Sequence, residues 1–133
     1  MPSQGVESAK TALIVDDEPE VRRFIVAALA RHGYRTLHAG GAIEALSVAQ
    51  QDIDVLVTDF ALPGADGITL AEWFIERLPG VGVVFTSGFT ELPRQRLEDL
   101  PARWAFLPKP FRTLPLIEAV RSVVTEAGDA RAA

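Results

Sequence analysis

The chain has 133 residues, which suits one domain, and 48% of them are hydrophobic, which is enough for a core and excludes a disordered chain. The formal net charge of −5 argues against a nucleic-acid-binding surface, and the absence of cysteine excludes disulfides, thiolate metal sites and a cysteine nucleophile. The start of the chain has no apolar signal core and no apolar run approaches the length of a membrane span, so we expect a soluble, cytoplasmic protein that binds neither membrane nor nucleic acid.

Strand and helix patterns alternate along the chain after a polar stretch at 1–10, which we expect to be a flexible tail. Short apolar runs predict buried strands, and a less apolar stretch is interpreted as one more, so that the five strands are 11–15, 34–39, 54–60, 81–87 and 104–107. Apolar residues at helical spacing, weakest in the fourth segment, predict helices at 19–33, 42–51, 68–78, 92–100 and 113–128. Residues 129–133 would be a second tail.

The alternation of five strands with five helices predicts one α/β domain over residues 11–128, in which a parallel sheet is covered by helices on both faces. Right-handed crossovers leave few topologies for such a sheet. In an open sheet of this kind the ligand site lies beyond the carboxyl ends of the strands, at the switch point of the strand order. The stretch 63–67 predicts a turn in which Gly64 and Gly67 shape the loop under Asp59.

Polar side chains stand at the ends of four predicted strands, and they are Asp16, Asp17, Asp59, Thr86, Ser87 and Lys109. Because parallel strands end at one edge of a sheet, we expect these side chains to converge on one pocket. Two unit charges at about 4 Å repel by about 4 kcal/mol at an effective dielectric of about 20, so either some of the acids are protonated or a cation lies among them. Oxygen ligands without histidine or cysteine suit a hard ion such as Mg²⁺.

Asp59 has a second possible task, because a carboxylate can attack phosphorus and form an aspartyl phosphate. A metal ion would draw charge from the transferred group, Lys109 could neutralise one phosphoryl oxygen, and the Ser87 hydroxyl could donate to another. The chain has two lysines, and Lys109 stands between Pro108 and Pro110, which is an unusual place for a lysine that only aids solubility.

These motifs together resemble the receiver domain of two-component response regulators, of the chemotaxis type or the hybrid-kinase type, over residues 11–127. The resemblance rests on "VDDEP", "VTDFALPGADG", "TSG" and "KPF", with Ser87 28 positions after Asp59 and Lys109 22 positions after Ser87. It implies a flavodoxin-like, doubly wound, five-stranded parallel sheet of order 2-1-3-4-5 with five helices. The stretch "FTSGF" is similar to receivers attached to hybrid histidine kinases.

The resemblance implies a role for each acid. Asp59 would be the phosphoacceptor, supplied by a phosphohistidine of a histidine kinase or of a histidine phosphotransfer protein. Mg²⁺ would be bound by Asp17, Asp59 and the main-chain carbonyl of Ala61, with Asp16 acting mainly through ordered water. Lys109 would pair with Asp59 and then with the phosphoryl group, and its bond to the following proline is often cis in this family.

The resemblance also implies a switch. Ser87 takes the place of the switch hydroxyl, with Thr86 as the alternative, and Phe106 takes the place of the rotating aromatic. Charge on Asp59 would reshape the face made by 92–100, 104–107 and 113–128, where an unknown downstream protein or a weak dimer partner would bind an otherwise monomeric chain. Kinase docking is expected around Val21, Phe24 and Ile25 of the first helix and around Pro110 and Phe111.

Since the chain stops about one turn after the last predicted helix, we expect a stand-alone receiver that phosphorylates and dephosphorylates only itself. Two alternatives remain open: a degenerate receiver that binds partners whatever its phosphorylation, and a Mg²⁺-dependent phosphatase with an aspartate nucleophile. Against the phosphatase, the position two after Asp59 is Ala61 and not a second acid. A plainer interpretation of Asp16 and Asp17 is a side-chain turn and a helix N-cap.

Overall fold

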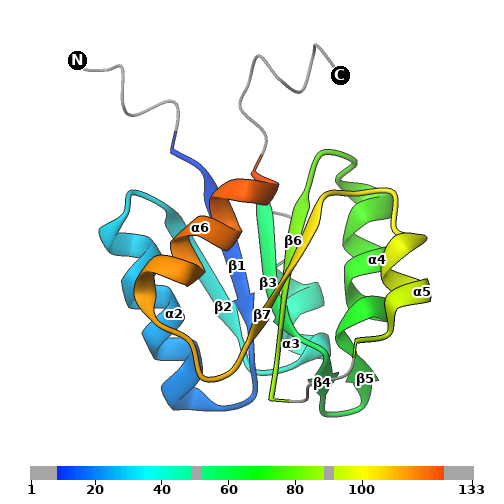
Figure 1. The fold of residues 1–133 in the computed structure, drawn as a ribbon, viewed down its shortest axis with the longest axis horizontal. Coiled ribbons are helices and arrows are strands. Elements are labelled where there is room, and N and C mark those ends of the chain that lie inside the picture. Colours follow the sequence, from blue (N-terminus) through cyan, green and yellow to red (C-terminus); the bar gives the residue numbers. More distant parts are fainter. Residues whose placement is uncertain (1–8, 49–51, 89–91, 125–133) are drawn as a thin grey trace.

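A computed structural model describes residues 9–48, 52–88 and 92–124 of the chain. Its main sheet has five parallel strands in the order β2-β1-β3-β6-β7 (Figure 1), and the strands are β1 (Thr11–Val15), β2 (Arg35–Ala39), β3 (Val55–Asp59), β6 (Gly82–Ser87) and β7 (Trp104–Pro108). Since β6 and β7 are the fourth and fifth strands of this sheet, the predicted order 2-1-3-4-5 and the predicted flavodoxin-like fold are confirmed.

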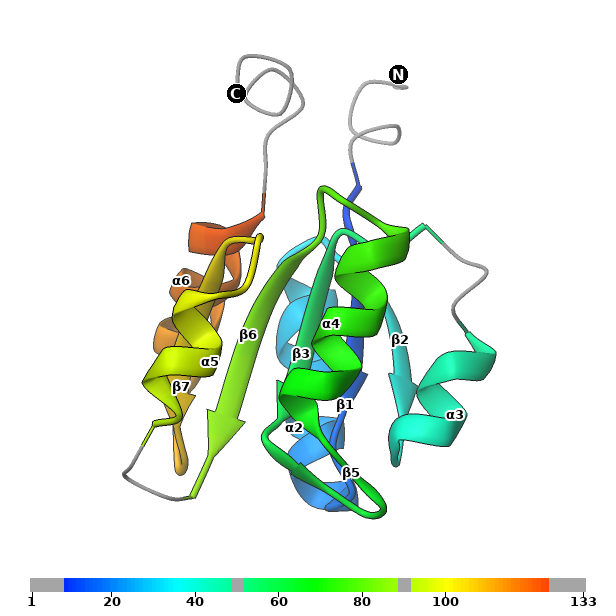
Figure 2. The same ribbon diagram turned by 90° about the vertical axis from the view of Figure 1, so that its right-hand side faces the viewer.

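Two layers of helices cover the sheet (Figure 2), and the described residues form α2 (Pro19–Arg31), α3 (Ala42–Ser47), α4 (Gly67–Arg77), α5 (Arg94–Glu98) and α6 (Thr113–Val123). Core residues of α2 and α6 pack on one face of the sheet, and those of α3, α4 and α5 pack on the other. Strand β1 is buried throughout because alternate side chains enter the two cores: Leu13 lies on the α4 side and Ile14 on the α2 side.

The helices begin within two residues of the predicted positions, while α2 ends two residues and α4 one residue before the predicted limit. Pro19 begins α2, which ends at Arg31 before Gly33 in a left-handed conformation with φ of 93°. Helix α5 is shorter than the predicted 92–100. A residue that precedes a proline disfavours the helical conformation, and Pro93 lies inside this segment while Pro101 directly follows it. The predicted ends of 42–51 and 113–128, and all or most of both predicted tails, lie outside the described residues.

A small antiparallel hairpin, β4 (Ala61–Leu62) and β5 (Ala65–Asp66), occupies the segment predicted as a turn. Gly64 turns it with φ of 78°. Gly67 is needed for space instead, because a Cβ at that position would overlap the main-chain carbonyl oxygen of Asp59. The Gly67 N–H donates to the carbonyl of Phe60 at 2.6 Å. The hairpin therefore packs against the end of β3, and the two glycines shape the loop next to Asp59 as the sequence predicted.

Candidate functional site

The strand ends bring the predicted acids and the lysine together. Asp16 directly follows β1, Asp59 ends β3, and Lys109 directly follows β7. Carboxylate oxygens of Asp16, Asp17 and Asp59 lie within 4.8 Å of one another. Asp16 and Asp59 are buried, with 1% and 8% exposed, whereas Asp17 is exposed. The result is an acidic pocket with one side open to solvent, at the edge of the sheet where the strand pattern predicted it.

Lys109 is the shared cation of this pocket. Its Nζ donates to Asp59 Oδ2 at 2.6 Å and to Glu18 Oε1 at 3.0 Å, and it lies 3.1 Å from Asp16 Oδ2. Burial lowers the pKa of Lys109, but the hydrogen bonds to Asp59 and Glu18 and the nearby negative charge of Asp16 outweigh burial and raise the pKa above its ordinary value. The ammonium group therefore stays charged at neutral pH. The Lys109–Pro110 peptide bond is cis, as the resemblance implied.

Asp16 is held by its backbone and leaves one oxygen without a hydrogen bond. Its Oδ1 accepts from the Glu18 N–H at 2.9 Å, which is the side-chain turn considered above, while the N-cap of α2 is Glu18 itself. Its carbonyl accepts from Arg22 at 2.7 Å. Its buried Oδ2 has no hydrogen-bond partner among the described residues, since the approach of Lys109 lacks hydrogen-bond geometry. Burial raises the pKa of Asp16 despite these contacts.

The donor set fits a hard divalent cation. The buried Asp16 Oδ2 would gain a partner from a cation among the three aspartates, and the added charge would offset the burial that disfavours its ionised form. The available ligands are all oxygens, which favours Mg²⁺ over the metals that histidine or cysteine would select. The pocket is thus an acidic site of the Mg²⁺-binding type.

The carboxylate of Asp59 is fixed from two sides. Ala61 donates its backbone N–H to Asp59 Oδ1 at 3.0 Å, and Lys109 holds Oδ2. The main chain of Ser87 accepts from the Lys109 N–H at 2.8 Å, so the end of β6 positions the lysine backbone. Thr86 lies beside Asp59 in the register of β3 and β6. Its buried hydroxyl has no hydrogen-bond partner among the residues that the structure describes.

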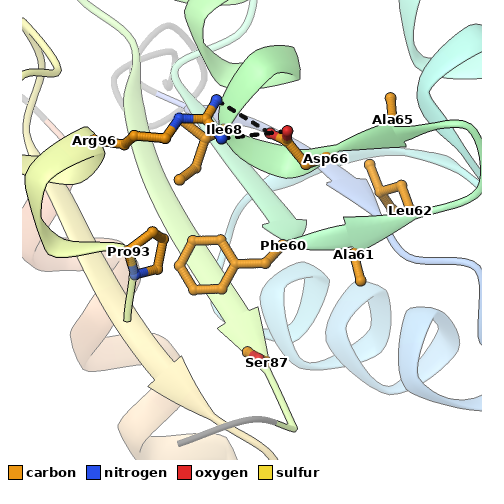
Figure 3. Close-up of a pocket in the computed structure, with 9 residues that line it drawn as sticks. All are labelled: Phe60, Ala61, Leu62, Ala65, Asp66, Ile68, Ser87, Pro93 and Arg96. Carbon is orange, nitrogen blue, oxygen red and sulfur yellow. Dashed lines mark hydrogen bonds and ion pairs between the residues drawn. The ribbon is translucent and has the colours of Figure 1, made fainter. Parts of the chain in front are cut away.

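A pocket of about 560 Å³ opens beside the site (Figure 3). Ser87 and Ala61 line one end of it, and the ion pair between Arg96 of α5 and Asp66 of β5 spans the opposite rim at 3.3 Å. Most of the wall is apolar and includes Phe60, Leu62, Ile68 and Pro93. Ser87, although only 1% exposed, therefore belongs to the wall of this pocket.

Phe60, which lines this pocket, is the central ring of a stack of three phenylalanines. Phe60, which follows Asp59, stacks on Phe85 with ring centroids 4.9 Å apart and on Phe106 with centroids 5.9 Å apart. The interplanar angles are 14° and 18°. Phe106 is half-buried and belongs to β7. The aromatic that the resemblance identified as a switch therefore contacts the residue next to the predicted phosphoacceptor.

Asp66 is expected to contribute a pH-dependent part of the stability. Its Oδ1 caps α4 by accepting from the Thr69 N–H at 2.7 Å. Burial raises the pKa of Asp66, but the Thr69 N–H and the Arg96 guanidinium outweigh burial and lower it below 3.8. Because the folded pKa is depressed, this stabilisation is present above pH 3.8 and is lost as the pH falls through the folded pKa.

We expect Asp66→Ala to lower the free energy of unfolding by about 1 kcal/mol at pH 7, the usual cost of a lost N-cap. Asp66→Asn should cost less, because asparagine still caps the helix and only the half-exposed ion pair with Arg96 is lost. Urea unfolding at pH 7 and near pH 3 measures both, and Arg96→Gln serves as the control for the ion pair alone. Equal losses for the alanine and asparagine variants would contradict a capping role.

Two residues at the site were not identified from the sequence. Glu18 reaches Lys109 although they are 91 positions apart, and Arg22 donates to the Asp16 carbonyl from the second turn of α2. Glu18 directly follows the acid pair, and this adjacency was the signal that could have indicated it. The expected docking surface stays a prediction, and the structure corrects one of its residues. Phe24 and Phe111 are in ring contact at 6.0 Å, but Ile25 is 1% exposed and belongs to the core.

None of the helices in the described parts of the chain is long and apolar enough to cross a membrane.

The family model "Response regulator receiver domain" matches residues 12–121. The chain is 30% identical over 119 residues to the response regulator receiver protein CpdR of Brucella abortus, covering 89% of this chain and 99% of that protein. It is 32% identical over 122 residues to the sensor kinase CckA of the same organism, covering 90% of this chain but 13% of the kinase.

Solved structures that resemble this chain are also described as receiver domains. The crystal structure of the receiver domain from the hybrid histidine kinase CckA is 33% identical with a TM-score of 0.69, covering 84% of this chain and 95% of that one. A CheY-like receiver domain protein from Methanospirillum hungatei JF-1 is 25% identical with a TM-score of 0.77, covering 86% of this chain and 92% of that one. With the family model matched over most of its length, the chain belongs to the response regulator receiver domain family.

Proposed function

We propose that Asp59 accepts a phosphoryl group from a phosphohistidine, on a histidine kinase or a histidine phosphotransfer protein, in a Mg²⁺-dependent reaction. Receiver domains act with histidine kinases, and members of this family are generally not true enzymes. The observation that carries the proposal is the fixed carboxylate of Asp59, bonded to Lys109 at 2.6 Å and to the Ala61 N–H at 3.0 Å beside two further aspartates.

The chemistry follows from these contacts. A carboxylate oxygen of Asp59 forms a bond to phosphorus while the phosphorus–nitrogen bond breaks and the electron pair leaves with the histidine ring. Asp16, Asp17, Asp59 and the Ala61 carbonyl would hold the Mg²⁺, which supplies charge neutralisation when bound. Lys109 exchanges its bond to Asp59 for one to a phosphoryl oxygen.

For the switch, we propose Ser87 rather than Thr86 as the hydroxyl that donates to the phosphoryl group. Its support is the place of Ser87 in the wall of the pocket that Ala61 also lines, whereas Thr86 is not among the residues that line it. Phe106 would respond through its stack on Phe60. The changed surface would then be that of α5, β7 and α6, which an unidentified downstream protein or a second copy would contact.

The docking of the phosphodonor protein is proposed at Phe24 and Phe111, with Val21 and the exposed Pro110 at its edge. The two alternatives gain no support from the geometry. A degenerate receiver is disfavoured by the assembled acids and lysine. A phosphatase of this type would need a general acid two positions after Asp59, and the residue there is Ala61.

The test is incubation of the purified protein with acetyl phosphate and Mg²⁺, followed by intact mass measurement. We expect a gain of about 80 Da, one phosphoryl group, in the presence of Mg²⁺. The gain should disappear when a chelator removes the metal, because the acidic pocket alone repels the anionic donor. A protein that gains no mass from acetyl phosphate, phosphoramidate or a phosphorylated histidine kinase would refute the proposal.

A further inference from the structure

We propose that Glu18 is a specificity-determining residue of this site, which slows phosphorylation by small, highly charged free donors. The inference rests on the proposed function of Asp59. Glu18 does so in two ways: its carboxylate engages the Lys109 ammonium that the phosphoryl group needs, and it adds negative charge at the mouth of the pocket.

The contact of Glu18 with Lys109 is specific in geometry. The Oε1–Nζ distance is 3.0 Å, similar to the 3.1 Å that separates Nζ from Asp16 Oδ2. The backbone around Glu18 is fixed, because its N–H bonds to Asp16 Oδ1 and its carbonyl accepts from the Arg22 N–H at 3.0 Å. From the N-cap position of α2, the Glu18 side chain thus extends across the edge of the sheet and contacts Lys109.

Exposure distinguishes Glu18 from the other acids that contact Lys109. The side chain of Glu18 is 60% exposed, whereas those of Asp59 and Asp16 are 12% and 1% exposed. Glu18 is also outside the group of three aspartates whose oxygens approach within 4.8 Å of one another. It therefore lies on the solvent side of Lys109, where a donor must enter, and not among the candidate metal ligands.

Charge counting gives the same assignment. The three negative charges of Asp16, Asp17 and Asp59 equal the two positive charges of one Mg²⁺ and the single positive charge of Lys109. Without Glu18, the pocket would therefore be formally neutral when the metal is bound. Arg22 bonds to the main-chain carbonyl of Asp16 and forms no ion pair with these acids in the described parts of the chain. Glu18 is the carboxylate left over. Its exposed position next to the entrance makes its charge act on an incoming anion rather than on the metal.

The consequence is discrimination by donor charge. Acetyl phosphate is a dianion near neutral pH, and it must pass Glu18 and replace it as a partner of Lys109. Phosphoramidate carries a compensating positive charge, so the same carboxylate repels it less. A protein donor can offset the repulsion with its own cationic side chains, which a small molecule lacks.

The test compares Glu18→Gln with Glu20→Gln, an exposed acid in the first turn of the same helix with no ion pair to Lys109 in the described structure. At saturating Mg²⁺ and low ionic strength, we expect Glu18→Gln to accelerate phosphorylation by acetyl phosphate about fivefold. The gain should be smaller for phosphoramidate and should shrink as salt is raised. Glu20→Gln should stay within about twofold of the wild type. Glu18→Asp, which keeps the charge, should retain most of the slow acetyl phosphate rate.

Equal acceleration by both glutamine variants would overturn the proposal, as would a Glu18→Gln gain that is the same for both donors or insensitive to salt. Wild-type and variant rates that agree within twofold would also overturn it while leaving phosphorylation of Asp59 intact. Absence of any phosphorylation in all variants would instead refute the proposed function itself.

Discussion

Asp59→Asn is expected to abolish the gain of about 80 Da with acetyl phosphate and Mg²⁺, because the neutral amide is nearly isosteric with the carboxylate but is not a nucleophile toward phosphorus. The substitution also removes the Oδ2 partner that lies 2.6 Å from Lys109 and one of the three clustered carboxylates. We expect Mg²⁺ to raise the melting temperature of the wild type, and this rise should be smaller in the variant, since a ligand that binds the folded state less tightly stabilises it less.

Asp54→Asn is the matched control, with the same chemical change five residues earlier on the same segment. Asp54 accepts from the Thr11 N–H at 2.8 Å at the opposite end of the sheet, so its loss should reduce stability but spare phosphorylation and Mg²⁺ binding. Intact mass and thermal unfolding with and without Mg²⁺ provide both readouts. An Asp59→Asn protein that still gains one phosphate would show that another side chain is the acceptor.

Gly67→Ala should have the second large effect. An added Cβ would overlap the carbonyl oxygen of Asp59, which is backbone and has no rotamer by which to move away. Gly67 does not have a positive φ, so the expected cost comes from the close approach of the Asp59 main chain and not from backbone strain. We expect a loss of about 1–3 kcal/mol in the free energy of unfolding, typical of overpacking, and a slower phosphorylation of the remaining folded protein.

Gly82→Ala separates these two effects. Its Cβ would overlap the carbonyl oxygen of Val123, at the amino end of β6 and away from the acids, so it should destabilise to a similar degree. Urea unfolding gives the stabilities, and phosphorylation rates are then compared under conditions in which both variants are folded. If both variants phosphorylate at the same rate, the hairpin under Asp59 has no part in positioning the acceptor.

The sheet was predictable because its apolar runs are short and a polar residue of the site stands at the end of four of the five strands. Strand β3, for example, ends at Asp59, and β6 ends at Ser87, as the runs indicated. The hairpin of β4 and β5 was not predictable as strands, since two residues are too few for any periodicity. Its composition indicated the turn correctly and gave no information on the pairing.

The site was predictable where a side chain follows a strand end, and less so where it reaches across the sheet. Asp16, Asp59 and Lys109 are positioned by strand order alone. Glu18 reaches Lys109 through the length and rotamer of its side chain, which strand order does not indicate. Ile25 was wrongly assigned to the docking surface, because helical spacing defines a helix face only to within one residue. The roles predicted for the site residues, those of Ala61, Thr86, Ser87 and Phe106 among them, remain predictions.

The stack of Phe85, Phe60 and Phe106 gives the protein a spectroscopic probe of its own. Ring-current shifts fall off steeply with the separation and tilt of neighbouring rings, and here the central ring belongs to the residue after Asp59. Proton NMR of selectively labelled phenylalanine would therefore follow the chemistry at the acceptor without any fluorophore or introduced tag.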